Sequence, residues 1–216
     1  MSNSKSLADI RRDYSRHELD ESQVAADPLI QFERWFNEAL DAQVMEANAM
    51  HLASVSSDGR PSGRMVLLKG LEDEHFIFYT NYQSQKGKEL EENPACCLTF
   101  FWPELERQVR IEGLATRVAV ETSDTYFKSR PRGSQIGAMA SPQSAIIKDR
   151  KILETRFADL EQKHAADSSL TRPKQWGGFQ VKPHLIEFWQ GRPSRLHDRI
   201  RYLREDNGWS LQRLAP

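Results

Sequence analysis

The feature that most constrains the fold is a succession of short strand patterns joined by tight turns. Strand-like runs cover residues 50–55, 64–69, 75–80, 96–102, 107–118, 179–189, 195–204 and 209–214. Asp58-Gly59 and Asn207-Gly208 are typical of hairpin turns. Helical patterns lie in blocks and do not alternate strictly with the strands. The sequence therefore predicts a mainly β, α+β fold: an antiparallel barrel with flanking helices.

The helical patterns cover residues 28–44, 84–93, 121–130 and 146–164, and 166–177 is expected to be a loop. Asp27 and Pro28 suit an N-cap and a first helical position. Residues 1–26 are polar and are predicted to form a partly mobile N-terminal arm. Residues 27–216 are predicted to form a single domain.

The composition argues against several classes of protein. Among 216 residues, 30 Lys and Arg balance 31 Asp and Glu, so no global field draws the chain to nucleic acid or an anionic membrane. No apolar run is long enough to span a bilayer, and the polar start lacks the apolar core of a secretory signal. Adjacent Cys96 and Cys97 predict no framework disulfide. We expect a cytoplasmic protein.

One basic cluster lies near the C-terminus. Four cationic or titratable side chains alternate there: Arg195, His197, Arg199 and Arg201. On a regular strand they share one face, and Leu196 and Ile200 occupy the other, where they are expected to pack inward. Such a face needs an anion or water, so a solvated outer face and a ligand site both remain open. Trp189 just upstream slightly favours a planar, phosphorylated ligand.

A second cluster is Tyr126, Arg130 and Ser134. Tyr126 and Arg130 lie one helical turn apart, and Ser134 is expected in a Pro-Arg-Gly turn. The three could hold a phosphate, or Arg130 could simply favour the helix dipole.

A third group is more weakly indicated. Strand parity places Arg64 and Lys69 on opposite faces unless a bulge intervenes, and Lys86 lies near a helix start, where a phosphate could bind. The sequence lacks dinucleotide, Walker, nucleophile-elbow and zinc-protease motifs, and no histidines pair at metal-ligand spacing. We therefore expect no metal.

The C-terminal string Arg195-Leu196-His197-Asp198-Arg199, preceded by residues 186–191, resembles the signature of the pyridoxine/pyridoxamine 5'-phosphate oxidase family. Further blocks agree in order, at residues 26–29, 64–69, 78–81, 105–109, 129–137 and 176–179, so the resemblance covers roughly residues 7–216. It implies a split β-barrel, a homodimer, and flavin mononucleotide (FMN) bound at the subunit interface.

The resemblance also implies residue roles. The implied FMN site comprises Arg64, Met65, Val66, Leu67, Leu68, Lys69, Tyr79, Thr80, Gln85, Lys86, Gln108, Gln143, Ser144, Trp189 and Arg199. The implied substrate site comprises Arg11, Arg12, Asp13, Tyr14, Lys69, Tyr126, Arg130, Ser134, Arg195, Leu196 and His197. Arg195 and His197 are the catalytic candidates, and residues 11–14 match a segment that closes over the site. Gln85 departs from the pattern, because many relatives carry Arg there.

The implied reaction is oxidation of pyridoxine or pyridoxamine 5'-phosphate by O2 to pyridoxal 5'-phosphate and H2O2, a step of vitamin B6 biosynthesis and salvage. Two rivals remain. One is another split-barrel flavoenzyme, such as a flavin reductase with a nicotinamide donor, which needs no substrate-phosphate cradle. The other is a non-catalytic protein that binds flavin, haem or pyridoxal phosphate.

Overall fold

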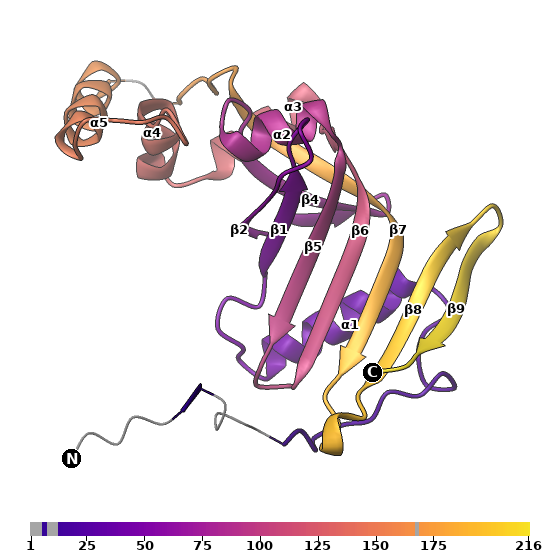
Figure 1. Ribbon diagram of the computed structural model, residues 1–216. Coiled ribbons are helices and arrows are strands. Elements are labelled where there is room, and N and C mark those ends of the chain that lie inside the picture. Colours follow the sequence, from indigo (N-terminus) through magenta and orange to yellow (C-terminus); the bar gives the residue numbers. More distant parts are fainter. Residues whose placement is uncertain (1–5, 8–12, 167–168) are drawn as a thin grey trace, which may run out of the picture. The chain divides into compact units, whose positions relative to one another are not determined.

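The computed structural model describes residues 6–7, 13–166 and 169–216 (Figure 1). Its helices are α1 (Pro28–Asp41), α2 (Gln85–Glu92), α3 (Val120–Ser129), α4 (Arg132–Ala140) and α5 (Lys151–Lys163), with a short 3-10 turn at Pro193–Arg195. Its strands are β1 (Ala49–Val55), β2 (Pro61–Leu67), β3 (Gly70–Glu72), β4 (His75–Asn81), β5 (Ala95–Trp102), β6 (Arg107–Arg117), β7 (Trp176–Gln190), β8 (Asp198–Glu205) and β9 (Gly208–Leu214). No described helix has the length and apolar character needed to cross a membrane.

The strands form one sheet in the order β2-β1-β5-β6-β7-β4-β3, and β8 pairs with both β7 and β9. The pairs β1–β2, β3–β4, β4–β7, β7–β8 and β8–β9 are all antiparallel. The predicted antiparallel sheet with flanking helices is therefore confirmed (Figure 1).

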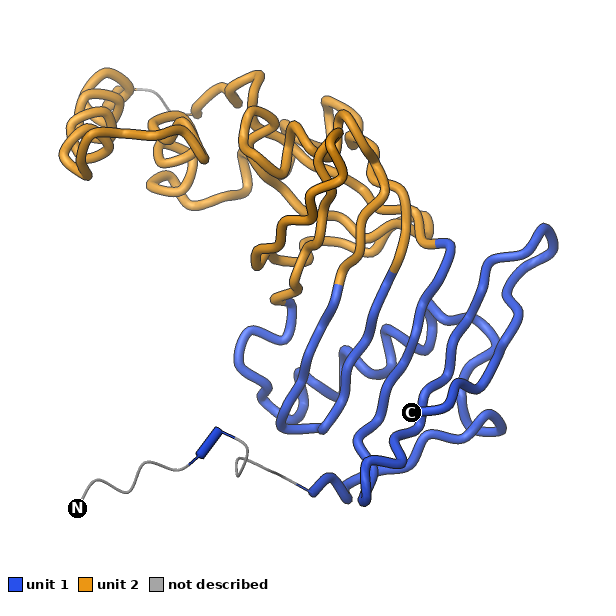
Figure 2. Tube along the Cα trace, viewed as in Figure 1, with its two compact units in different colours: residues 1–48, 99–111, 184–216 blue, residues 49–98, 112–183 orange. Residues whose placement is uncertain are grey.

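The chain divides into two compact units that interleave along the sequence (Figure 2). Unit 1 contains residues 1–48, 99–111 and 184–216, and unit 2 contains residues 49–98 and 112–183. The predicted division into an arm over residues 1–26 and one domain over residues 27–216 stays a prediction.

Helix α1 covers the sheet strands of unit 1. Its apolar residues recur at helical spacing, so they form one face of the helix, which packs on the sheet. Phe32 and Trp35 are buried, and their rings lie 5.1 Å from Phe100 and 5.2 Å from Phe188. The Asp27 side chain accepts a hydrogen bond from the Leu29 backbone N–H at 2.8 Å, so the predicted N-cap is confirmed. The helix ends at Asp41, slightly before the predicted end.

Unit 2 contains strands β1 to β4 and the helices that carry most of the predicted binding residues. The apolar side chains of Phe127, Ile136, Leu170 and Trp176 form a buried cluster beneath α3 and α4. This cluster fixes the positions of the two helices that follow β6.

Several sequence-based boundaries are wrong. The strand predicted over residues 64–69 is β2, which begins at Pro61 and ends at Leu67, and the short β3 that follows it was not predicted. Strand β7 begins at Trp176, inside the predicted loop. Residues 132–140 form helix α4, although a turn was predicted around Ser134. Helix α5 begins at Lys151, five residues after the predicted Ile146, whose side chain is fully exposed. Strand β8 begins at Asp198, so Arg195 and His197 precede it.

Gly113 on β6 allows two backbones of unit 2 to approach closely. A Cβ there would lie 2.4 Å from the Lys182 carbonyl oxygen and 2.8 Å from Val181 Cγ1. Because the carbonyl belongs to a paired strand, Gly113→Ala should destabilise the fold by about 1–3 kcal/mol. Urea denaturation measures the loss. Thr116→Ala, at an exposed position of the same strand, should change stability by less than about 0.5 kcal/mol. Equal midpoints for both variants would contradict the prediction.

Candidate functional site

A cavity of about 370 Å³ lies within unit 2. Its walls come from β2, β4, α2, α3, α4 and the start of β7. The lining residues are Met65, Val66, Leu67, Lys69, Tyr79, Thr80, Asn81, Lys86, Tyr126, Arg130, Gly137, Ala138, Ser141, Gln143 and Trp176. The structure thus brings together ten predicted residues that span from position 65 to position 143.

One part of the cavity wall is an aromatic stack beside Arg130. The Tyr79 and Tyr126 rings lie 3.8 Å apart, and Tyr126 is nearly parallel to Trp176, at an interplanar angle of 5°. The Arg130 guanidinium carbon lies 4.5 Å above the Trp176 ring. Its Nη1 is buried and has no hydrogen-bond partner among the described residues. A buried guanidinium N–H without an acceptor is costly, so this position favours an anionic ligand.

A second cation, Lys86, lines the cavity from helix α2. Its side chain is buried, and its Nζ lies 3.4 Å from Thr80 Oγ1. Burial, followed by repulsion from Arg64, lowers the pKa of Lys86. The Gln143 amide oxygen accepts hydrogen bonds from Thr80 Oγ1 at 3.1 Å and from the Asn81 N–H at 3.2 Å. A second anion near Lys86 would offset the cost of burying this ammonium group.

Arg64 is bound by a buried acidic network and does not line the cavity. Its Nη2 lies 3.3 Å from Glu89 Oε2, which also accepts hydrogen bonds at 2.6 Å from both Ser54 and Ser62. Gln85 Nε2 donates to Glu89 Oε1 at 2.9 Å. Burial alone would raise the pKa of Glu89, but these hydrogen bonds and Arg64 lower it to about 2.

The Glu89 network predicts a specific acid dependence of stability. The folded pKa lies below the ordinary value of 4.5, so the ionised group stabilises the fold above pH 4.5. This contribution is lost as the pH falls from about 4.5 to about 2. Glu89→Gln should lower the free energy of unfolding by about 1–3 kcal/mol at pH 7. At pH 3 the free energies of unfolding of the variant and the parent should differ less. Urea denaturation at both pH values measures this. Glu91→Gln, which removes an exposed ion pair with Arg117, should cost no more than about 1 kcal/mol; an equal loss there would refute the explanation.

The predicted catalytic pair lies in unit 1, beside an aromatic group. The His197 ring lies 4.7 Å from Trp189 and 5.9 Å from Tyr14, centroid to centroid. The Arg192 backbone N–H donates to His197 Nδ1 at 3.0 Å. Burial and the nearby Arg195 charge lower the pKa of His197. The lowered pKa favours the neutral ring, and in that ring the hydrogen bond accepted at Nδ1 leaves the proton on Nε2.

The predicted alternation along residues 195–201 is wrong at its start. Ser194 and Arg195 have positive φ values of 57° and 63°, which interrupt the extended backbone. Leu196 was expected to pack inward but is 70% exposed, whereas Ile200 is fully buried as predicted. Strand period therefore does not place Arg195 and His197 on one face.

Arg199 on β8 is paired with the buried Glu187. Its Nε lies 2.7 Å from Glu187 Oε1, and Arg110 Nη2 lies 2.6 Å from Glu187 Oε2. Both guanidinium groups compensate the charge of this carboxylate. Burial alone would raise the pKa of Glu187, but the hydrogen bonds from Arg199 and Arg110 lower it.

The remaining predicted residues lie outside the cavity. Ser134 is exposed on α4, Leu68 is buried, Gln108 is half-buried on β6, and Asp13 is exposed. Ser144 and Gln85 line a second cavity of about 600 Å³ in unit 2, which Gln143 also lines. Arg11 and Arg12 lie outside the described residues. The roles given to all these residues stay predictions.

Sequence reasoning missed five residues of the cavity wall: Asn81, Gly137, Ala138, Ser141 and Trp176. Trp176 was assigned to a loop, although it begins β7. The signal was present in the Trp-Gly-Gly block, because a large aromatic beside two glycines is typical of close packing.

Comparisons with known proteins identify the family. A family model described as "Pyridoxamine 5'-phosphate oxidase" matches residues 36–164, and one described as "Pyridoxine 5'-phosphate oxidase C-terminal dimerisation region" matches residues 176–216. Two relatives are named pyridoxine/pyridoxamine 5'-phosphate oxidase. The protein from Acaryochloris marina is 54% identical over 98% of this chain and 96% of its own. The protein from Chromobacterium violaceum is 57% identical over 99% of this chain and 100% of its own.

A solved structure agrees with the sequence comparisons. PhzG from Burkholderia lata 383, in complex with tetrahydrophenazine-1-carboxylic acid, has a TM-score of 0.88 and 31% identity, covering 95% of this chain and 100% of PhzG. The predicted split-barrel fold is thus confirmed. The full-length matches and the shared fold show that the chain belongs to the pyridoxine/pyridoxamine 5'-phosphate oxidase family.

Proposed function

We propose that this chain oxidises pyridoxine 5'-phosphate and pyridoxamine 5'-phosphate to pyridoxal 5'-phosphate, with FMN as cofactor and O2 as the final electron acceptor. The observation that supports this best is the unit 2 cavity, which three cations, Lys69, Lys86 and Arg130, line together with the aromatic stack. Arg130 has a buried N–H that has no acceptor in the part of the chain that the structure describes, and Lys86 is buried with only weak compensation. Two phosphate groups, one on the substrate and one on the cofactor, would supply the missing negative charge.

Arg130 and Tyr126, with Lys69, which also lines the cavity, suit the substrate phosphate. Lys86 and Thr80 suit the FMN phosphate. When bound, FMN would supply the redox chemistry, a two-electron oxidation at the substrate C4' carbon with O2 as the final acceptor and H2O2 as its product. The remaining residues that we assign to these two sites are those named in the sequence analysis.

The part proposed for His197 is orientation of the reacting end of the substrate. Its Nδ1 accepts the Arg192 N–H, so Nε2–H of the neutral ring is free to donate a hydrogen bond to the C4' substituent. Arg195 supplies positive charge beside it. From the amine substrate the first product is an imine, which water hydrolyses to the aldehyde.

We further propose a homodimer with FMN at the subunit interface, in the cytoplasm. The match of residues 176–216 to a dimerisation region supports self-association. Sedimentation of the flavin-loaded protein tests it: a monomer with full flavin occupancy would contradict the interfacial site.

PhzG suggests an alternative ligand, because its structure holds a carboxylic acid that lacks a phosphate. The three cations of the unit 2 cavity favour phosphorylated ligands, and so do the names of the relatives that are 54% and 57% identical.

The deciding experiment mixes FMN-loaded protein, pyridoxine 5'-phosphate and O2, and follows aldehyde and H2O2 together. We expect equal amounts of both, and much slower reaction with unphosphorylated pyridoxine. A flavin reductase would instead consume a reduced nicotinamide without forming aldehyde. A binding protein would form neither product. Acid precipitation of the yellow protein should release free FMN; flavin retained in the pellet would exclude non-covalent binding.

A further inference from the structure

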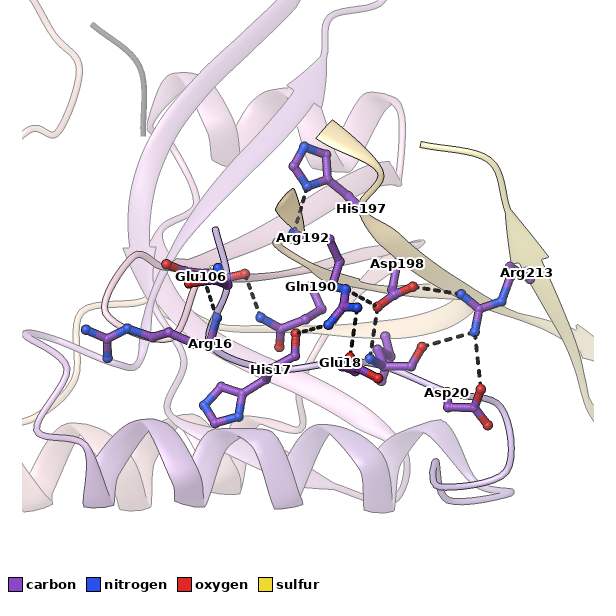
Figure 3. Close-up of polar contacts among 12 residues, drawn as sticks. Arg16, His17, Glu18, Asp20, Glu106, Gln190, Arg192, His197, Asp198 and Arg213 are labelled. Carbon is purple, nitrogen blue, oxygen red and sulfur yellow. Dashed lines mark hydrogen bonds and ion pairs between the residues drawn. The ribbon is translucent and has the colours of Figure 1, made fainter. Parts of the chain in front are cut away.

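Within unit 1, backbone N–H groups of residues 15–19 donate hydrogen bonds to two carboxylates. The first carboxylate is Glu106, which is 3% exposed and lies in the turn between β5 and β6 (Figure 3). Its Oε2 accepts the Ser15 N–H at 2.9 Å and the Arg16 N–H at 3.1 Å. Ionised acceptors make stronger hydrogen bonds than neutral ones, so Glu106 is suited to fix this part of the chain.

The second carboxylate is Asp198, the residue directly after His197. Its Oδ2 accepts the Leu19 N–H at 3.1 Å, while Arg213 Nη1 lies 2.9 Å from its Oδ1 (Figure 3). Arg192 Nε lies 3.5 Å from Asp198, and Arg192 also donates to the His17 carbonyl oxygen at 3.3 Å. The loop that presents His197 is thus joined to the N-terminal segment.

Between these attachments and the N-terminus, Tyr14 packs on the His197 group. Its ring is edge-on to Trp189 at 5.7 Å and lies 5.9 Å from His197. A Cβ on Gly191 would lie 2.6 Å from Tyr14 Cγ, so Gly191 leaves the space that Tyr14 occupies.

We propose that Glu106 and Asp198 are positioning residues, which bind the backbone of residues 15–19 and thereby hold Tyr14 against His197 and Trp189. They act on the reaction only through Tyr14 and His197. The inference rests on the proposed function insofar as His197 faces the substrate. It adds that the orientation of His197 depends on a segment remote from it in sequence.

The choice of variants is limited by the backbone of Glu106, whose φ is +56°. Asn tolerates this conformation, so Glu106→Asn shortens the side chain and removes its charge without adding strain. Glu106→Gln keeps an oxygen acceptor at the original reach and should rescue part of the effect. Glu104→Gln is the matched control, since Glu104 is an exposed carboxylate of the same turn.

The first measurement is amide hydrogen exchange in the FMN-loaded protein without substrate. In Glu106→Asn, the Ser15 and Arg16 amides should exchange about tenfold faster, because each loses its acceptor. Glu106→Gln should fall between Glu106→Asn and the parent, and Glu104→Gln should match the parent. Unchanged exchange in Glu106→Asn would overturn the attachment. This result does not depend on whether the protein oxidises pyridoxine phosphate.

The second measurement is titration of His197 by NMR, with the signal assigned through His197→Asn. The groups facing this ring are Tyr14, Trp189, Arg195 and Asp198. Burial lowers the pKa of His197, so release of Tyr14 in Glu106→Asn should raise that pKa toward 6.5. A purely structural role for Glu106 would lower stability and leave this titration unchanged, which would refute the positioning role.

Gly191→Ala separates the two steps of the argument. It leaves both carboxylates intact and displaces Tyr14, so the His197 pKa should rise while the Ser15 and Arg16 amides exchange at the parent rate. In both Gly191→Ala and Glu106→Asn, reduction of the flavin by pyridoxine 5'-phosphate in an anaerobic single turnover should slow about tenfold. If the flavin were reduced at the parent rate while Tyr14 is displaced, the proposed effect of Tyr14 on catalysis would be refuted.

Discussion

Arg130→Ala is expected to weaken substrate binding by roughly ten- to a hundredfold while FMN stays bound, because the variant loses a charge-assisted contact of about 1.5–3 kcal/mol. The guanidinium lies over Trp176 with a buried N–H that no described residue accepts, so its assigned partner is the substrate phosphate. Arg130→Lys keeps the charge without the planar fork and should lose less affinity. Titration with pyridoxine 5'-phosphate under anaerobic conditions measures the change.

The matched control is Lys128→Ala, which removes an exposed cation from the same helix end. It should leave substrate affinity within about twofold of the parent, since surface charges contribute little. If Arg130→Ala lost flavin as readily as substrate, Arg130 would belong to the cofactor site.

The second large effect is expected for His197→Asn and Arg195→Leu. Both should retain flavin and reduce it more slowly in an anaerobic single turnover, by roughly a hundredfold for His197→Asn if it loses a positioned proton donor. The Asn side-chain oxygen can still accept the Arg192 N–H, so the loop is preserved while Nε2–H is lost.

Measurement of the two half-reactions separates the possible roles of this pair. Slow reduction with normal reoxidation places the residues at the substrate. Normal reduction with slow reoxidation by O2 moves them to the second half-reaction. Normal rates in both would remove Arg195 and His197 from the active site, as expected for side chains on a solvated face.

The fold was largely predictable because most strands show a strong local pattern. Hairpin turns and apolar alternation located β1, β4, β5 and β6 to within one or two residues. Helix α4 was missed because Pro131, Gly133 and Gly137 are helix-breaking signals. Packing of Ile136 against Phe127 and Trp176 outweighs that weak local propensity.

The site was predictable in composition but not in detail. Tyr126 and Arg130 lie one helical turn apart, which predicted that the two side chains are neighbours, and both line the cavity. Arg64 pairs with Glu89, which lies 25 positions away in the sequence, so a local sequence pattern cannot predict this pairing. The positive φ values at Ser194 and Arg195 occur without a glycine, so the sequence gives no sign of them. For this reason the alternating pattern wrongly predicted a strand from residue 195.

The interleaving of the two units limits how this gene can be divided. The chain passes between units after residues 48, 98, 111 and 183, and β5, β6 and β7 each contain one of these crossings. No single cut yields either unit as one continuous polypeptide. A fragment ending at residue 183 would lose β8, β9 and the second half of β7 together. Neither unit could therefore be exchanged by a single recombination event, and separating the units would require breaks at all four crossings, of which three lie inside strands and one directly before β1.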